Sequence, residues 1–360
     1  MSMLPSSESG ADSTATRSVA LGLWAPLLLG LVIAFFALEW VRVHIVFDTE
    51  TAGAAAYTTS VFGKSGGLQV HCQDRRDTQK CITDYRASGS PPAVLWLGNS
   101  QLHSINRFRP GQETASQILH AKLTAEGMYL VTYSQPNANL TEHQILFRQL
   151  KKEYKLKTLV LPVCLDDFRE SGVRPTIGDA VVPGGQAPPP TQEQAFSPQT
   201  HVEAWLLRNL GQHWTLWRFR PAIKGLVDYA AYASRNLLLG INAQTKRPVS
   251  AGLYSEKMKI LREILGEAKA SGVPVVLYVP PYRQDVSGPY VASQYEGFVR
   301  DLERLSDGDQ VHVVDLTRIV PGPEWGMLKD PLLKVEDYDF MHFTADGHRR
   351  LASELEKALR

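Results

Sequence analysis

Short apolar runs alternate with longer, one-sided segments along most of the chain beyond residue 92. The runs have the length and composition of buried strands, whereas the one-sided segments repeat their apolar residues with the period of a helix. Strand and helix in alternation predict an α/β domain whose mostly parallel sheet is covered by helices on both faces, in three layers. The runs expected to form strands are 93–98, 128–133, 157–164, 273–279 and 311–316.

Local signals mark where the helices between these runs begin and end. One helix is expected to stop at Gly127, because glycine commonly ends a helix. A second is expected near Thr141, where a Thr-x-x-Gln pattern can satisfy the free N–H groups of a first turn, and a third after Ser255. A last helix follows Thr344. His348 falls in register with the leucines on the apolar face of that helix, which predicts a structural role for it.

The N-terminal part has a different pattern. Residues 19–38 contain no charged side chain and are long enough, at about 1.5 Å per residue, to span a bilayer as a helix. A single transmembrane anchor is therefore predicted at 19–40, with 1–18 as a cytoplasmic tail. A secretory signal peptide is the alternative, but no small-x-small cleavage site follows the run. Arg17 and Arg42 flank it symmetrically, so flanking charge does not set its orientation.

The remaining chain divides into a lead-in and one main domain. Residues 41–92 are polar and are expected to be rich in loops, and the α/β domain is expected over 93–360 with an insertion at about 171–249. The insertion starts with a Gly/Pro-rich linker and continues as an aromatic, basic, amphipathic helix. This helix suits a membrane interface or a membrane partner, or equally packing on the main domain. Its apolar stripe is formed by Leu206, Leu210, Trp214 and Trp217.

Composition narrows the function classes. The 360 residues include 38 Lys+Arg and 37 Asp+Glu, so no global basic field favours nucleic-acid binding. The sequence shows no metal-ligand cluster, phosphate loop or dinucleotide fingerprint, and no cofactor or metal is predicted.

Cys72 and Cys81 lie close together in a polar stretch and could form a disulfide in an oxidising compartment or remain two free thiols. Cys164 lies in an apolar run and is expected to be a buried, unreactive thiol.

Three residues suggest nucleophilic catalysis. A serine hydroxyl is a poor nucleophile until a base takes its proton, and a third group must hold that base in the right tautomer. Ser100 follows a predicted strand, but taken alone it is equally typical of a serine in an ordinary turn. Asp339 and His342, three residues apart in a loop-like stretch, can supply the orienting carboxylate and the base. Together the three predict a catalytic triad.

The order of these motifs resembles the SGNH hydrolase superfamily. Gly98-Asn99-Ser100 is similar to its Gly-Asp-Ser block, and Asp339-Phe340-Met341-His342 is similar to its Asp-x-x-His block. The resemblance covers roughly 93–170 and 250–360 and implies a flavodoxin-like fold, here preceded by one transmembrane helix. The single anchor and the run from Val279 to Arg283 look most like the D-alanyl transfer protein and related envelope polysaccharide O-acyltransferases.

This resemblance implies an enzyme anchored once in the inner (cytoplasmic) membrane, with its catalytic domain in the periplasm or extracytoplasmic space. Ser100 would carry an acyl group, expected to be acetyl, to a hydroxyl of a cell-envelope or secreted polysaccharide. A membrane-bound O-acyltransferase would be the donor partner. Two alternatives stay open: an envelope carbohydrate esterase or deacetylase with the same triad, and a non-catalytic accessory subunit that docks a membrane O-acyltransferase.

The expected oxyanion and substrate-binding residues depart from the family pattern. Asn137 replaces a glycine, but asparagine tolerates a left-handed backbone, so its N–H can still donate. Where Gly-x-Asn-Asp is expected, the chain has Cys164-Leu165-Asp166-Asp167, and an ionised aspartate cannot donate to an oxyanion. Asp166 and Asp167 could instead cap the next segment. Arg283 could face an anionic or hydroxyl-rich acceptor or lie on the surface. The candidates are therefore Gly98, Asn137, Asn139, Asp166 and Arg283.

Overall fold

The computed structural model describes most of the chain after residue 56. The described residues are 26, 29–33, 36, 57–73, 75–169, 172–173, 177, 234, 237–329 and 336–360. The chain divides into two compact units, residues 1–53 with 198–229 and residues 54–197 with 230–360. Nearly all described residues belong to the second unit, which contains the sheet and the candidate site.

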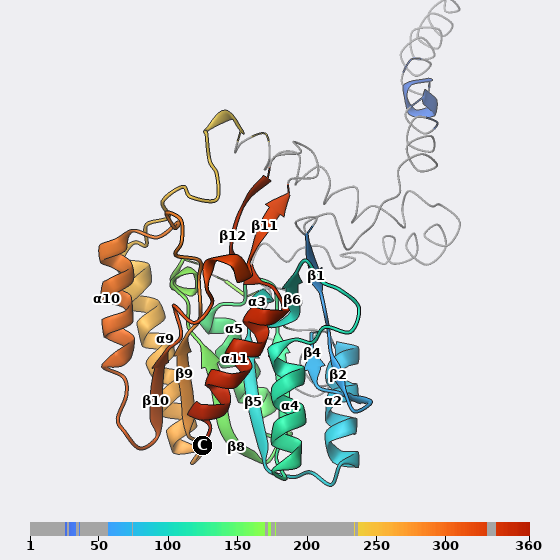
Figure 1. Ribbon diagram of the computed structural model, residues 1–360, viewed down its shortest axis with the longest axis vertical. Helices are drawn as coiled ribbons and strands as arrows, with labels where there is room; N and C mark the ends of the chain where they lie inside the picture. Colours follow the sequence, from blue (N-terminus) through green and yellow to red (C-terminus); the bar gives the residue numbers. More distant parts are fainter. Residues whose placement is uncertain are drawn as a thin grey trace, which may run out of the picture. The chain divides into compact units, whose positions relative to one another are not determined.

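A six-stranded parallel sheet lies at the centre of the second unit (Figure 1). Its strand order is β10-β9-β8-β5-β7-β4, and every neighbouring pair is parallel. Counted from β5, five of these strands have the flavodoxin-like order 2-1-3-4-5, in which the chain reverses direction across the sheet at β5. The strands are β4 (His71–Cys72), β5 (Ala93–Gly98), β7 (Tyr129–Ser134), β8 (Leu156–Pro162), β9 (Val275–Val279) and β10 (Val311–Asp315).

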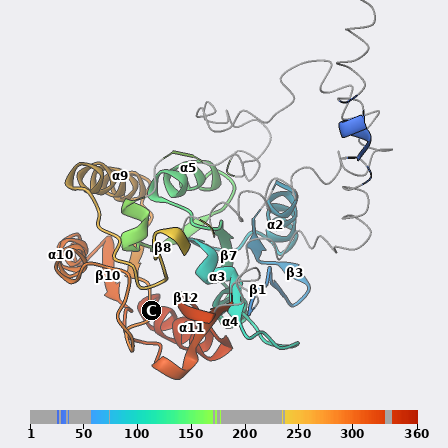
Figure 2. The ribbon, with the colours of Figure 1, turned by 90° about the horizontal axis from the view of Figure 1, so that it is seen from above.

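Helices cover both faces of the sheet (Figure 2). One face carries α2 (Arg75–Ala87), α5 (Leu140–Leu150), α9 (Ala251–Ala270) and α10 (Ala292–Glu303). The other carries α4 (Ala115–Ala125) and α11 (Ala345–Ala358). Strand β5 is buried along its whole length. Its Leu95 and Leu97 lie in the core under α2, α5, α9 and α10, and its Val94 and Trp96 lie in the core under α4 and α11. The predicted three-layer α/β arrangement is confirmed.

Two helices begin earlier than their sequence signals suggest. Helix α5 is capped by Asn139, whose side chain accepts from the N–H groups of Thr141 and Glu142, while Glu142 reaches back to the N–H of Asn139. Helix α9 is capped by Ser250 rather than Ser255. Both differences arise because several nearby side chains are suitable caps, and the tertiary position of the chain selects one of them.

Several short elements complete the domain. They are β1 (Thr58–Ser60), paired antiparallel with β6 (Ser104–Asn106), the hairpin of β11 (Trp325–Lys329) and β12 (Glu336–Phe343), and the short hairpin of β2 (Lys64–Ser65) and β3 (Leu68–Gln69). Single turns form α3 (Ser100–His103), η1 (Leu165–Phe168) and η3 (Gly322–Glu324). Asp339 and His342 therefore lie on strand β12 and not in a loop, as their polar neighbours had suggested.

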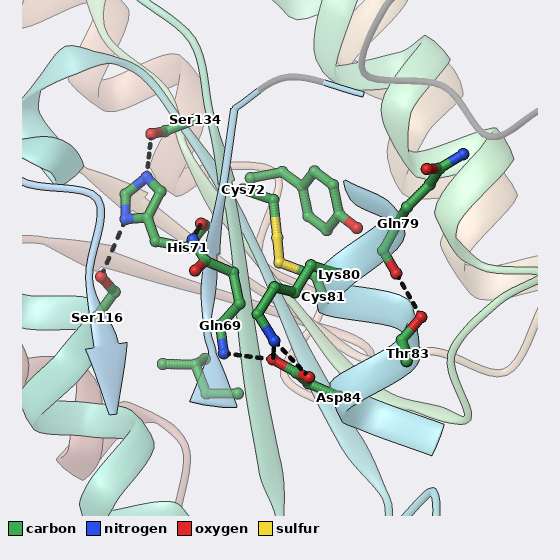
Figure 3. Close-up of a disulfide and its surroundings, with 12 residues drawn as sticks. Gln69, His71, Cys72, Gln79, Lys80, Cys81, Thr83, Asp84, Ser116 and Ser134 are labelled. Atoms are coloured by element: carbon green, nitrogen blue, oxygen red, sulfur yellow. Dashed lines mark hydrogen bonds and ion pairs between the residues drawn. A yellow bond between two sulfur atoms is a disulfide. The ribbon is translucent and has the colours of Figure 1, made fainter. Parts of the chain in front are cut away.

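The expected loop-rich lead-in is instead part of the domain over residues 57–92. Strand β4 forms one edge of the main sheet, and α2 packs its apolar side into the core. A disulfide joins Cys72 on β4 to Cys81 on α2, and both residues are fully buried (Figure 3). The folded domain thus begins well before residue 93.

Two expectations fall on parts of the chain outside the described residues. Only residues 26, 29–33 and 36 of the predicted anchor are described, and they are helical. Among the described residues, no helix combines the length and the apolar character needed to span a bilayer. The amphipathic stripe from Leu206 to Trp217 lies wholly outside them, as does most of the insertion.

Candidate active site

Ser100 lies at the carboxyl edge of the sheet, immediately after the central strand β5. It is the first residue of the one-turn helix α3. Asn99 before it is extended, and its side-chain oxygen accepts from the N–H of Gln101, which fixes the turn. Gly98 is required for this turn because a Cβ there would lie 2.2 Å from Cδ1 of Leu102. Gly98 thus makes room for α3, a steric role rather than the predicted oxyanion or substrate contact.

The structure brings Ser100, His342 and Asp339 together. The Oγ of Ser100 lies 3.0 Å from Nε2 of His342, and Nδ1 of His342 lies 2.9 Å from Oδ2 of Asp339. Both separations are hydrogen-bond distances. In this arrangement the carboxylate accepts the proton of Nδ1, which leaves Nε2 free to accept the serine proton.

Asp339 is almost entirely buried, with 2% of its surface exposed. Its Oδ1 accepts from the backbone N–H groups of Met341 (3.0 Å) and His342 (2.9 Å). Asn106, at the end of β6, places its amide nitrogen 3.5 Å from Oδ2 of Asp339 and also donates to the Met327 carbonyl at 3.0 Å. The carboxylate orientation is therefore set by its own strand and by β6.

The charges of the pair reinforce each other. Burial lowers the pKa of His342, but the negative charge and hydrogen bond of Asp339 outweigh this, so its pKa is raised above 6.5. Burial raises the pKa of Asp339, but the charge of His342 and the hydrogen bonds from His342 and Met341 reduce it below its usual value. An ionised Asp339 is therefore favoured, and its charge would stabilise an imidazolium formed if His342 took the proton of Ser100.

Gln101 connects the segments that carry Ser100 and His342, a contact that the sequence did not reveal. It is 2% exposed, and its side-chain nitrogen donates to the carbonyls of Pro281 and Met341, each at 2.8 Å. One amide group therefore connects α3 with the end of β9 and with the residue preceding His342. No local pattern marks this residue, because its partners lie 180 and 240 positions away.

Two backbone N–H groups at the cavity that contains Ser100 are the candidate oxyanion donors. Asn137 has a left-handed backbone with φ of 51° and lines the same cavity as Ser100. Within the described part of the chain, the N–H groups of Ser100 and Asn137 have no acceptor. Asn139 is not available as a donor to the site, because its side chain caps α5 and donates to the Gly172 carbonyl at 3.2 Å.

The two acidic residues after β8 have different roles. Asp167 is buried, and its Oδ2 accepts from the N–H of Cys164 at 2.8 Å, which caps η1. Asp166 lines the cavity but accepts from the hydroxyl of Tyr290 and from Arg169, each at 2.8 Å. Burial and the nearby aspartates raise the pKa of the Cys164 thiol well above its usual value, so it is a poor nucleophile.

Arg283 is neither a surface residue nor a lining residue of this cavity. It is 8% exposed, and its guanidinium forms two hydrogen bonds with the carboxylate of Asp285, at 2.8 and 3.0 Å. It also donates to the Gly326 carbonyl at 2.9 Å and lies 4.6 Å from the ring centre of Tyr338. Arg283 thus holds the β11–β12 hairpin, which carries Asp339 and His342.

A cavity of about 710 Å³ opens beside Ser100 and His342. Residues 239–248 form one wall, where Leu239 and Ile241 are apolar and Lys246 and Arg247 are cationic. This volume accommodates a small-molecule or sugar-sized ligand. Among the residues with described positions, no group of three or more His, Cys, Asp or Glu residues is placed to hold a metal ion.

No family model and no curated protein matches the chain. Among solved structures, it is similar to a GDSL-like lipase from Bacteroides thetaiotaomicron, at 10% identity and a TM-score of 0.38 over 79% of this chain and 98% of the other. It is also similar to a variant of an acetyl-xylooligosaccharide esterase from Geobacillus, at 13% identity and a TM-score of 0.37 over 74% of this chain and 94% of the other. A third similar structure is that of a carbohydrate esterase family 2 enzyme from Myceliophthora fergusii, at 12% identity and a TM-score of 0.34 over 74% of this chain and 66% of the other.

Proposed function

We propose that this chain is a serine acyltransferase that moves an acyl group, expected to be acetyl, onto a hydroxyl of a cell-envelope or secreted polysaccharide. The observation that carries the proposal is the pair of hydrogen bonds from Ser100 to His342 and from His342 to Asp339, at 3.0 and 2.9 Å. This geometry is the one in which a serine hydroxyl becomes a nucleophile.

In the first half-reaction, Oγ of Ser100 attacks the carbonyl carbon of a donor ester or thioester, and its proton passes to Nε2 of His342. The oxyanion faces the N–H groups of Ser100 and Asn137. Collapse of this intermediate breaks the bond to the donor alcohol or thiol, which leaves with the proton from His342. The products are the acyl-serine and the free alcohol or thiol.

In the second half-reaction, an acceptor hydroxyl gives its proton to Nε2 of His342 and attacks the acyl carbon. The bond to Oγ breaks, and Ser100 recovers the proton. Water can replace the acceptor, since 21% of the His342 side chain is exposed to solvent. An envelope carbohydrate esterase with the same triad is therefore the second candidate.

The proposed place of action is the outer side of the cytoplasmic membrane, with residues 19–40 as a single anchor. The disulfide between Cys72 and Cys81 supports this, because disulfides persist in oxidising compartments. A membrane-bound O-acyltransferase is the proposed donor partner. The apolar stripe of the insertion is the proposed contact with that partner.

The transferase and esterase reactions are separated by following the acetyl group. The full-length chain is incubated with a labelled, activated acetyl ester and a mixture of neutral and acidic oligosaccharides, and acetylated sugar and free acetate are both measured. The proposal predicts more acetylated sugar than acetate, and neither product above background with Ser100→Ala. Acetate alone would identify an esterase. If neither product depends on Ser100, both the transferase and the esterase function are contradicted.

A further inference from the structure

We propose that Lys246 and Arg247 form a binding site for an oxyanion, a carboxylate or phosphate, carried by the sugar that the acyl group is transferred to. This inference rests on the proposed function, because it names the class of acceptor that the same cavity takes. Both residues line the cavity that contains Ser100 and His342.

Among the residues that the structure describes, Lys246 and Arg247 have no carboxylate partner, unlike other basic residues. Arg169, which lines the same cavity, is paired with Asp166 at 2.8 Å. In contrast, Lys246 donates to the neutral Gly288 carbonyl at 2.6 Å and lies 3.4 Å from Oγ of Ser287. Within the described ranges, no carboxylate is paired with Lys246 or Arg247, and the Arg247 guanidinium has no hydrogen-bond partner. The wall therefore presents two charges that no carboxylate among the described residues neutralises.

The acidic residues of the cavity do not neutralise this wall either. Both oxygens of Asp166 are occupied, by Arg169 and by the hydroxyl of Tyr290. Asp167 is buried and caps η1 through the N–H of Cys164. Among the described residues of the cavity, both carboxylates are thus already engaged, Asp166 by a cation and Asp167 by donors of its own turn.

The backbone that carries the two cations is held on both sides. The N–H of Ala243 donates to Asp337 on β12 at 2.9 Å, and the N–H of Arg247 donates to the Pro289 carbonyl at 2.8 Å. Val249 then forms two hydrogen bonds with the side chain of Gln294, each at 3.0 Å. A fixed backbone reduces the entropy lost when the cations bind a ligand.

The chemistry of the wall favours a sugar acid or sugar phosphate over a neutral sugar. A guanidinium presents a planar fork that matches the two oxygens of a carboxylate or phosphate, and an ammonium adds a compact charge beside it. A neutral sugar would cover these cations without replacing their hydration. An acidic sugar would instead be oriented by its anion, which places one of its hydroxyls toward the acyl-serine.

The test measures binding separately from catalysis. Full-length Ser100→Ala protein, which cannot form the acyl-enzyme, is titrated calorimetrically with trigalacturonic acid and with its fully methyl-esterified form, in which each carboxylate is replaced by a neutral ester on the same sugar backbone. The acid is expected to bind about 10- to 100-fold more tightly than the ester, because one charge-assisted hydrogen-bonded pair contributes an affinity of about that size. Inorganic phosphate is added as a competitor, and its ability or failure to displace the acid shows whether the site also takes phosphate.

Variants then show which residues cause the preference for the acid over the ester. Adding Arg247→Gln and Lys246→Gln to Ser100→Ala should abolish the preference for the acid, whereas Arg247→Lys should retain part of it. Lys259→Gln removes the same charge from an exposed position on α9 outside the cavity and should leave the preference intact. Equal affinity for acid and ester, including no measurable binding of either, would overturn the inference, as would a preference that survives the double substitution.

This outcome is distinct from failure of the proposed function. Acylation of Ser100 in the protein with its serine intact is measured in parallel with a small activated acetyl ester. If Ser100 is acylated but charge on the sugar has no effect, only the inference about the acceptor is wrong. If Ser100 is not acylated, the proposed function itself is wrong, whatever the sugar affinities.

Discussion

The raised pKa of His342 sets the pH range in which Ser100 can be activated. Because the base must be unprotonated, the rate of Ser100 acylation by a small activated ester should rise with pH and level off above the pKa of His342, which lies above 6.5. Asp339→Asn removes the charge that raises this pKa, while burial still lowers it. The rise should therefore move to lower pH, and the plateau should fall about 10³- to 10⁴-fold, as in triads that lose their tautomer. A pH profile measured by stopped flow checks this, and an unmoved rise in Asp339→Asn would contradict it.

Gln101 is a positioning residue, because it acts through the backbone on either side of the triad. Gln101→Leu leaves the carbonyls of Pro281 and Met341 without their donor, which should cost about 1–3 kcal/mol of stability and lower kcat more than it raises KM. Gln144→Leu is the matched control, since Gln144 is buried and donates to Glu263 and Glu267 away from the site. Denaturant unfolding and ester kinetics separate the effects. Equal kcat for both variants at matched stability would refute the positioning role.

At the scale of elements, β4 and α11 each bring a buried histidine into the polar core beside α3. His71 on β4 is hydrogen-bonded to the hydroxyls of Ser116 and Ser134 (Figure 3). His348 on α11 accepts from the N–H of Ala115 at 3.1 Å and donates to the Ser104 carbonyl at 3.1 Å. Protonation of His348 would break the bond from Ala115, so its structural role, predicted from the helical register, requires the neutral form.

Burial, together with nearby histidine charge, lowers the pKa of His71 to about 3, and burial lowers that of His348 to about 4. Between pH 6.5 and these values, the unfolded chain binds protons that the folded chain does not, so stability should fall as the pH falls through this window. Each histidine contributes up to about 1.4 kcal/mol per pH unit. His348→Gln should reduce this slope in urea unfolding measured at pH 7, 6 and 5. His312→Gln, at an exposed position on β10, should not, and equal slopes in both variants would contradict the prediction.

Some elements could not be predicted because their patterns are weak. Strand β4 has two residues, too few to show a period, and α2 consists mostly of polar residues. Asp339 and His342 lie on an antiparallel hairpin strand whose residues are partly exposed, so its polar composition resembles that of a loop. In contrast, β5 is buried on both faces, and the apolar run 93–98 predicted its bounds correctly.

Across the whole molecule, the sequence predicted the sheet, and it singled out the three residues that the structure brings together at Ser100, because each of these features rests on a short segment. The residues that position the triad could not be predicted in this way. Gln101 contacts carbonyls 180 and 240 residues away, and Asn106 contacts Asp339 across 233 residues. Arg283 was expected to face a ligand or solvent, but its contact with Gly326 and its stacking on Tyr338 form only when the hairpin folds over it. The place of Lys246 and Arg247 at the cavity likewise depends on distant contacts, such as the bond from the N–H of Arg247 to the Pro289 carbonyl.

Ser100 is expected to carry the acyl group, and the intact mass of the full-length chain after brief exposure to an activated acetyl ester tests this expectation without a sugar acceptor. The mass should increase by one acetyl group, located on the peptide that contains Ser100, and the increase should disappear when an acceptor or water has had time to resolve the intermediate. His342→Ala should form the adduct far more slowly, and Ser100→Ala should not form it at that peptide. An adduct that persists in Ser100→Ala, or that maps to another nucleophile, would contradict the account.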